Sequence, residues 1–143
     1  MNSKPLAAYR EIRVKTASPG QLVVMLYDEA VKQCDRALEF LEHDLKKHPE
    51  YIEKVNTALS KTQDIVTELM ASLDFDAGGE IAQNLFALYV WFNKEIMEAN
   101  LVKDRKRIRT VRNQLDGLRN AWTEAARGVQ TGSQNSVGVN IAG

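Results

Sequence analysis

Runs of apolar residues at helical spacing, separated by strong helix breakers, constrain what this chain can fold into. The first run follows Ser18-Pro19-Gly20-Gln21. Ser18 is suited to cap a helix, Pro19 to occupy its first position, and Gln21 to close a capping box. No segment alternates with period two for long enough to predict a strand. The sequence therefore predicts an all-α fold.

Three further breaks divide the rest of the chain. They lie at Pro49, at the glycines of Asp74 to Gly79, and at a tight connection near Lys103-Asp104. The first predicted helix continues to about Asp44. The four apolar stripes consist of Leu22, Leu26, Ala30, Ala37 and Leu41; Val55, Leu59, Thr62, Val66, Leu69 and Leu73; Ile81, Leu85, Leu88, Phe92, Ile96 and Ala99; and Ile108, Val111, Leu115, Leu118, Trp122 and Ala125.

Four amphipathic helices of about 20 to 25 residues with short connections pack as antiparallel neighbours, because a short loop cannot carry the chain back to its starting end. The expected fold is an antiparallel up-down four-helix bundle over residues 18–127. Residues 1–17 form an N-terminal arm. Residues 128–143 are uncharged and rich in Gly, Ser, Asn and Gln, which is typical of a flexible tail.

Composition excludes several classes of protein. One cysteine cannot form an intramolecular disulfide, no run approaches the ~18 apolar residues of a membrane span, and the first ten residues lack a signal-peptide core. We therefore expect a cytosolic protein without membrane insertion. The 19 basic and 19 acidic residues balance, but residues 28–102 carry seven bases and fifteen acids, whereas residues 103–143 carry eight bases and three acids.

Two helices carry more apolar residues than one bundle-facing stripe needs. On a wheel of 100° per residue, Phe86, Val90 and Met97 lie about 140° to 180° from Ile81, and Tyr27, Val31 and Leu38 lie similarly far from Leu22. These six residues are predicted to line a groove for another chain's apolar helix. The alternative is that they are core, since a helix with neighbours on both sides buries a wide arc. This alternative is stronger for the first helix.

The arm carries Tyr9, Ile12 and Val14, so it could cover the same groove when no partner is bound. Exposed apolar stripes could also pair two copies of the chain, and the sequence leaves a homodimer open.

No catalytic, cofactor or metal site can be assembled from the sequence. His43 and His48 lack the Glu three residues earlier that di-iron bundles use, and Cys34 has no histidine near it in sequence. Gly78-Gly79 does not match a phosphate-binding loop. These observations favour a binding protein over an enzyme. The basic run 103–112 leaves RNA or DNA binding through the last helix as the alternative function, although Ile108 and Val111 interrupt the run at helical spacing.

Two blocks of sequence resemble a known family. The stretch YREIRVKTASPGQLVVMLYD, residues 9–28, is similar to the opening of the flagellin-specific secretion chaperones, the FliS family. The second block, residues 69–89, contains SLD, GGEIA, NL and LY in the order that the family shows. Ala99-Asn100 and Trp122 fit as well. Glu29 stands where many members have Gly, and the tail beyond Arg127 has no counterpart in the family pattern.

The resemblance implies a cytosolic chaperone of bacterial flagellar type III export, with no cofactor, metal or catalytic residue. Members bind the disordered C-terminal segment of flagellin, keep it from polymerising, and deliver it to the export gate. In the family the arm can occupy part of the flagellin site in the free chaperone. The tyrosine corresponding to Tyr9 is associated with transfer of the loaded complex to the gate.

Overall fold

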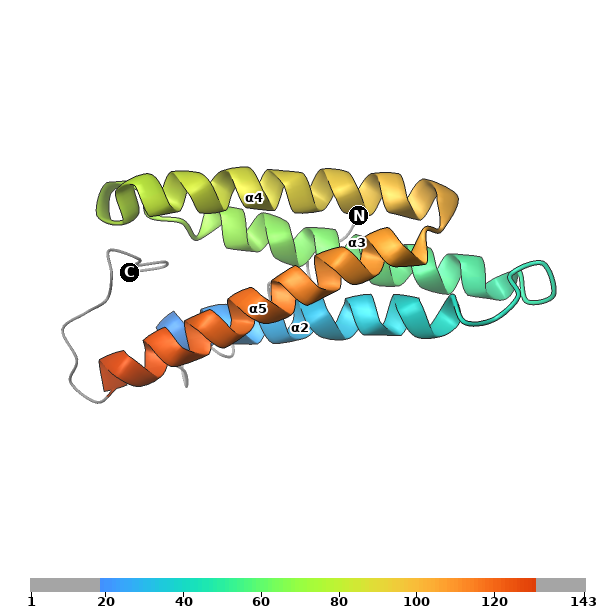
Figure 1. Cartoon of the computed structure of the whole chain (residues 1–143), viewed down its shortest axis with the longest axis horizontal. Helices are drawn as coiled ribbons and strands as arrows, with labels where there is room; N and C mark the ends of the chain where they lie inside the picture. Colours follow the sequence, from blue (N-terminus) through green and yellow to red (C-terminus); the bar gives the residue numbers. More distant parts are fainter. Residues whose placement is uncertain (1–18, 131–143) are drawn as a thin grey trace.

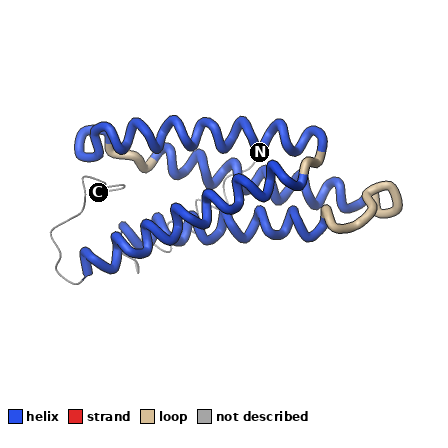
Figure 2. The backbone as a smooth tube through the Cα atoms, in the orientation of Figure 1, coloured by secondary structure: helices blue, strands red, loops and turns tan. Residues whose placement is uncertain are grey.

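The structure, a computed structural model, describes residues 19–130, and this part of the chain folds into four helices without a strand. The helices are α2 (Pro19–Phe40), α3 (Glu50–Ala71), α4 (Phe75–Val102) and α5 (Arg105–Gln130) (Figure 1). Each packs against two others, in the cycle α2, α3, α4, α5 and back to α2. Short loops connect them in alternating directions (Figure 2). The predicted up-down four-helix bundle is confirmed.

Aspartates fix the starts of the last two helices. The carboxylate of Asp74 accepts hydrogen bonds from the backbone N–H groups of Asp76 and Ala77, at 3.1 and 3.0 Å. Asp104 does the same for Lys106 and Arg107, at 3.0 and 3.2 Å. Each side chain satisfies donors that the first turn of a helix leaves unpaired. The connection between α4 and α5 can therefore be as tight as the sequence predicts.

Gly79 bends α4 near its start. Its φ of 51° and ψ of −126° are outside the helical range and in a region that glycine adopts most easily. The sequence predicts that the second helix ends before Asp74 and that the glycines separate it from the third. Helix α3 does end before Asp74, at Ala71, but the glycines lie within α4, because Asp74 caps a first turn ahead of them. The helical register is therefore interrupted at Gly79.

The core lies between the four helices, and the predicted stripes supply most of it. Three stripe residues differ from the prediction, and one of them, Leu73, lies in the connection after α3. Leu41 is buried in the turn after α2, which ends at Phe40 and not near Asp44. Ile81 is exposed, since α5 runs from the end of α4 toward the start of α2 and does not cover this part of α4 (Figure 1).

The end of α5 differs from the predicted end of the bundle. Helix α5 continues to Gln130 and so includes Gly128, where the tail was predicted to begin. The predicted arm, with Tyr9, Ile12 and Val14, and the tail from residue 131 onward lie outside the described residues.

Candidate functional site

An apolar stripe runs along the outer side of α4. Phe86, Val90 and Met97 are 42%, 45% and 52% exposed, and Leu101 is 77% exposed. Their spacing of four, seven and four residues places them on one face, about 120° from the buried face of the same helix. The buried face consists of Ala82, Tyr89, Phe92, Ile96 and Ala99. We call Phe86, Val90, Met97 and Leu101 the α4 outer stripe.

The predicted exposure of Phe86, Val90 and Met97 is confirmed, whereas their binding role stays a prediction. Sequence reasoning missed Leu101, although its position four residues after Met97 was an available signal. It also missed Phe75, Trp91 and Val102, which are exposed on α4. Periodicity could not have placed Phe75, because Gly79 interrupts the register between it and the rest of the helix.

The groove residues predicted on the first helix are core, so that part of the prediction is wrong. Tyr27, Val31 and Leu38 are 0%, 7% and 8% exposed. Helix α2 packs extensively against both α3 and α5, whereas α4 makes fewer contacts with its two neighbours. A helix enclosed on both sides buries a wide arc, and its second apolar stripe is then part of the core.

A buried pair of tyrosines joins α2 to α4 across the core. The hydroxyls of Tyr27 and Tyr89 are hydrogen-bonded to each other, and neither side chain is exposed. Burial raises the pKa of Tyr89 to about 12, and burial also raises the pKa of Tyr27 above its ordinary value. Both side chains are therefore neutral at neutral pH. The bond constrains the rotation of α4 about its axis, which keeps the α4 outer stripe directed away from the core.

Polar side chains line the seam between α3 and α4. Gln63 donates to the backbone carbonyl of Asn93 at 3.1 Å, and the Asn93 amide donates to the Thr67 hydroxyl at 3.3 Å. Thr67 in turn donates to the carbonyl of Gln63 at 3.0 Å. The first two bonds join α4 to α3 through polar groups, and the third positions the Thr67 hydroxyl within α3.

Three of the six arginines of α5 are engaged with acidic residues of neighbouring helices. Arg107 donates to both carboxylate oxygens of Glu95 at 2.8 Å and to Glu98 at 2.8 Å. These hydrogen bonds from Arg107 lower the pKa of Glu95. Two ion pairs link α5 to α2: Arg112 pairs with Asp35 at 2.9 Å, and Arg119 with Asp28 at 3.1 Å.

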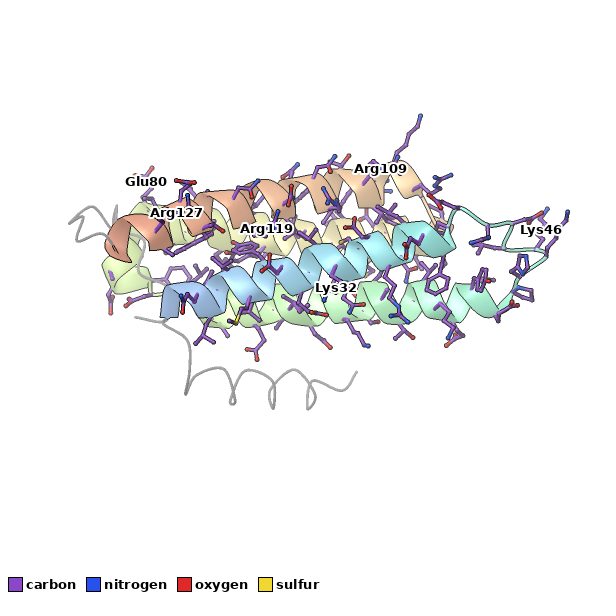
Figure 3. All side chains as sticks on the ribbon, turned by 90° about the horizontal axis from the view of Figure 1, so that it is seen from below. Lys32, Lys46, Glu80, Arg109, Arg119 and Arg127 are labelled. Carbon is purple, nitrogen blue, oxygen red and sulfur yellow. The ribbon has the colours of Figure 1, made fainter. Side chains whose placement is uncertain are left out.

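The seam between α2 and α5 is shallow and lined by charges of both signs, including Lys32 beside the arginines of α5 (Figure 3). Several basic residues near the end of the chain are therefore paired with acidic residues from its middle, within the bundle. Arg105, Lys106 and Arg109 remain exposed. This is a smaller basic surface than the run 103–112 indicated.

The described residues offer little that resembles a reactive site. Among them, no group of three or more His, Cys, Asp or Glu side chains could hold a metal ion. Cys34 is buried 3.8 Å from the Thr62 hydroxyl, and burial raises the pKa of its thiol to about 12. His43 and His48 pack against the ring of Tyr51 in and beside the loop after α2. Within residues 19–130, no helix is long and apolar enough to cross a membrane.

Comparison with known proteins agrees with the motif resemblance. The family model of the flagellar protein FliS matches residues 1–129. The flagellar secretion chaperone FliS of Salmonella typhimurium is 36% identical over 124 residues, which cover 83% of this chain and 87% of that protein. The proteins of the same name from Campylobacter jejuni and Bacillus subtilis are 32% and 28% identical, covering 86% and 94% of this chain and 91% and 96% of their own lengths. This chain belongs to the FliS family of flagellar secretion chaperones.

Proposed function

We propose that this protein binds the disordered C-terminal segment of flagellin in the cytosol, prevents its premature polymerisation, and delivers it to the flagellar export gate. The observation that carries the proposal is the α4 outer stripe, an apolar surface on the outside of a bundle whose relatives are named secretion chaperones. The proposed client surface lies on α4 and not in a groove between two helices, because Tyr27, Val31 and Leu38 of α2 are buried.

The length and shape of the stripe suit an amphipathic helix. From Phe86 to Leu101 it extends about 22 Å along α4, or roughly four turns. A partner helix that lays its own apolar positions along this line removes both surfaces from water, as in other helix-in-groove complexes. Flagellin assembles through apolar helical segments, so covering such a segment blocks assembly by mass action.

The affinity of such a complex is moderated by the cost of ordering the client. Each stripe side chain is already partly covered, so its burial contributes about 1 to 2 kcal/mol, below the value for a fully exposed residue. A disordered client loses conformational entropy on binding, which offsets part of this gain and permits release at the gate.

Calorimetry with a peptide from the C-terminal segment of the cognate flagellin tests the proposal. We expect binding with a negative heat-capacity change, weakened at least tenfold by Phe86→Asp or Val90→Asp with little change in melting temperature. Asn84→Asp is the matched control, because it adds the same charge at an exposed position of α4 outside the stripe. Absence of binding at tens of micromolar peptide would contradict the proposal.

The arm and its tyrosine belong to the same proposal. Deleting residues 1–15 should strengthen peptide binding if the arm competes for the client surface, because its displacement then no longer costs free energy. Replacing Tyr9 should leave client affinity nearly unchanged and weaken the association of the loaded complex with the gate. Unchanged peptide affinity after the deletion would show that the arm does not compete.

The alternative of nucleic-acid binding through α5 is not favoured by the structure. Two arginines of the run that suggested it, Arg107 and Arg112, are held by carboxylates of α2, α4 and α5. A residual attraction through Arg105, Lys106 and Arg109 would fall steeply with salt, with about one log unit of affinity lost per log unit of salt for each phosphate contacted.

A further inference from the structure

The start of α4 carries an apolar patch that depends on the kink. The rings of Phe75 and Phe86 lie 5.9 Å apart between centroids, in an edge-to-face arrangement. In a straight helix these residues would be separated by about 16 Å along the axis, too far for ring contact. The non-helical backbone at Gly79 therefore brings Phe75 back toward Phe86, and Val90 lies one turn further along. Phe75, Phe86 and Val90 are all more than 40% exposed, and we call them the α4 end patch.

This patch lies at the end of the bundle where α5 stops. Helix α5 runs toward the start of α2, where Ala126 would contact a side chain built on Gly20 at 3.4 Å, and it ends at Gln130. The beginning of α4 is at the same end of the molecule (Figure 1). Gln130, after which residues 131–143 follow, is therefore at the end of the bundle where α4 begins.

The sequence of this last segment pairs a linker with an apolar face. Residues 131–136, Thr-Gly-Ser-Gln-Asn-Ser, can span at most about 20 Å. After them Val137, Val139 and Ile141 alternate with Gly138 and Asn140, a pattern that puts three β-branched side chains on one side of an extended segment. Residues 131–143 have no acidic side chain that Asp74 and Asp76 beside Phe75 would repel.

We propose that Val137, Val139 and Ile141 bind the α4 end patch of their own chain. A short tether holds the segment at an effective concentration on the order of millimolar, so even a weak apolar contact is substantially occupied. A second copy of the chain at micromolar concentration cannot match this, which is why the occupant is the chain's own tail. The contact does not depend on the identity of the client.

Paramagnetic relaxation in the full-length protein tests the contact without any client. A spin label attached after Ser136→Cys lies next to the apolar face, and Cys34 stays unlabelled at neutral pH because it is buried with its thiol pKa raised to about 12. We expect resonances of Phe75, Phe86 and Val90 to broaden several-fold more than those of Ile52, an exposed apolar residue at the start of α3.

Two variants and one mixing experiment complete the test. Val137→Ser, Val139→Ser and Ile141→Ser together should abolish the selective broadening, whereas Asn135→Ser, a change in the linker, should leave it intact. Equal broadening of Ile52 and the patch, or broadening that survives the triple substitution, would overturn the proposal. So would selective broadening of an isotope-labelled chain by a separate spin-labelled chain, since the occupant would then be a second copy.

Discussion

Helices α2 and α4 each carry apolar side chains on two faces, yet they differ in what becomes of the second face. On α2 the second face, with Tyr27, Val31 and Leu38, is part of the core. On α4 the second face, with Phe86, Val90 and Met97, is at the surface. The extent of packing separates the two cases, because both helices have two neighbours but α2 packs more extensively on α3 and α5 than α4 does. A second apolar face favours burial. Packing of the helices decides whether the chain buries this face in its own core or leaves it at the surface.

The largest expected effect compares an aromatic side chain from each second face. Tyr27→Ala removes a buried ring and leaves a cavity, which should lower the free energy of unfolding by about 3 to 5 kcal/mol. Phe86→Ala removes a ring that is nearly half exposed and should cost less than about 1 kcal/mol. Urea denaturation followed by circular dichroism measures both. Similar losses in the two variants would mean that the α4 outer stripe contributes to the core.

The hydroxyl pair that joins the two helices should give the next largest effect. Tyr27→Phe leaves the Tyr89 hydroxyl buried without its partner and should cost about 1 to 2 kcal/mol, and Tyr89→Phe should cost a similar amount. The double substitution should cost less than the sum, because it removes both polar groups together. A double-mutant cycle from urea denaturation tests this, and strictly additive losses would exclude a direct interaction.

The same tyrosines predict a loss of stability at alkaline pH. Their folded pKa values are raised, so their contribution is fully present below the unfolded value near 10 and is lost as pH rises toward the folded values. For Tyr89 alone the loss between pH 10 and 11 should be about 1 kcal/mol. Unfolding measured across this range should show a shallower decline in Tyr89→Phe. An identical slope in the variant would assign the decline to other groups.

The smallest effect should come from the edge of α4 where Arg107 meets Glu95. The pKa of Glu95 is lowered in the folded protein, so its contribution is present above the unfolded value near 4.3 and is lost as pH falls through the folded value. Arg107→Gln should remove this acid dependence and destabilise less than either tyrosine substitution, with the difference fading at high salt. Arg105→Gln, at an exposed position two residues away, is the control. Equal effects of the two substitutions would mean that the pair contributes nothing specific.

Part of the site could be predicted from the sequence because it follows from helical geometry alone. Phe86, Val90 and Met97 were placed on the outer face by their spacing from the buried stripe, and Leu101 continues the same series. Phe75 could not be placed in this way. Its contact with Phe86 exists because Asp74 starts a turn ahead of Gly79 and the backbone then leaves the helical range.

The second faces show where sequence reasoning stops. The same excess of apolar residues predicts a groove on both helices, and this prediction is wrong for α2. The spacing along one helix contains no information on how closely the neighbouring helices approach. The path of α5 across the bundle, toward α2 and away from the start of α4, is a property of all four helices packed together (Figure 1).

The sequence by itself determined the all-α class, the four helices, most of the core and the family, because breakers, helical periodicity and motif order are local properties of the chain. Only the tertiary structure decided which apolar stripe is exposed, that Tyr27 and Tyr89 meet across the core, and that three arginines of α5 are paired with acidic residues of other helices. These outcomes depend on distances between helices. Such distances arise when side chains far apart in the sequence compete for the same interior space.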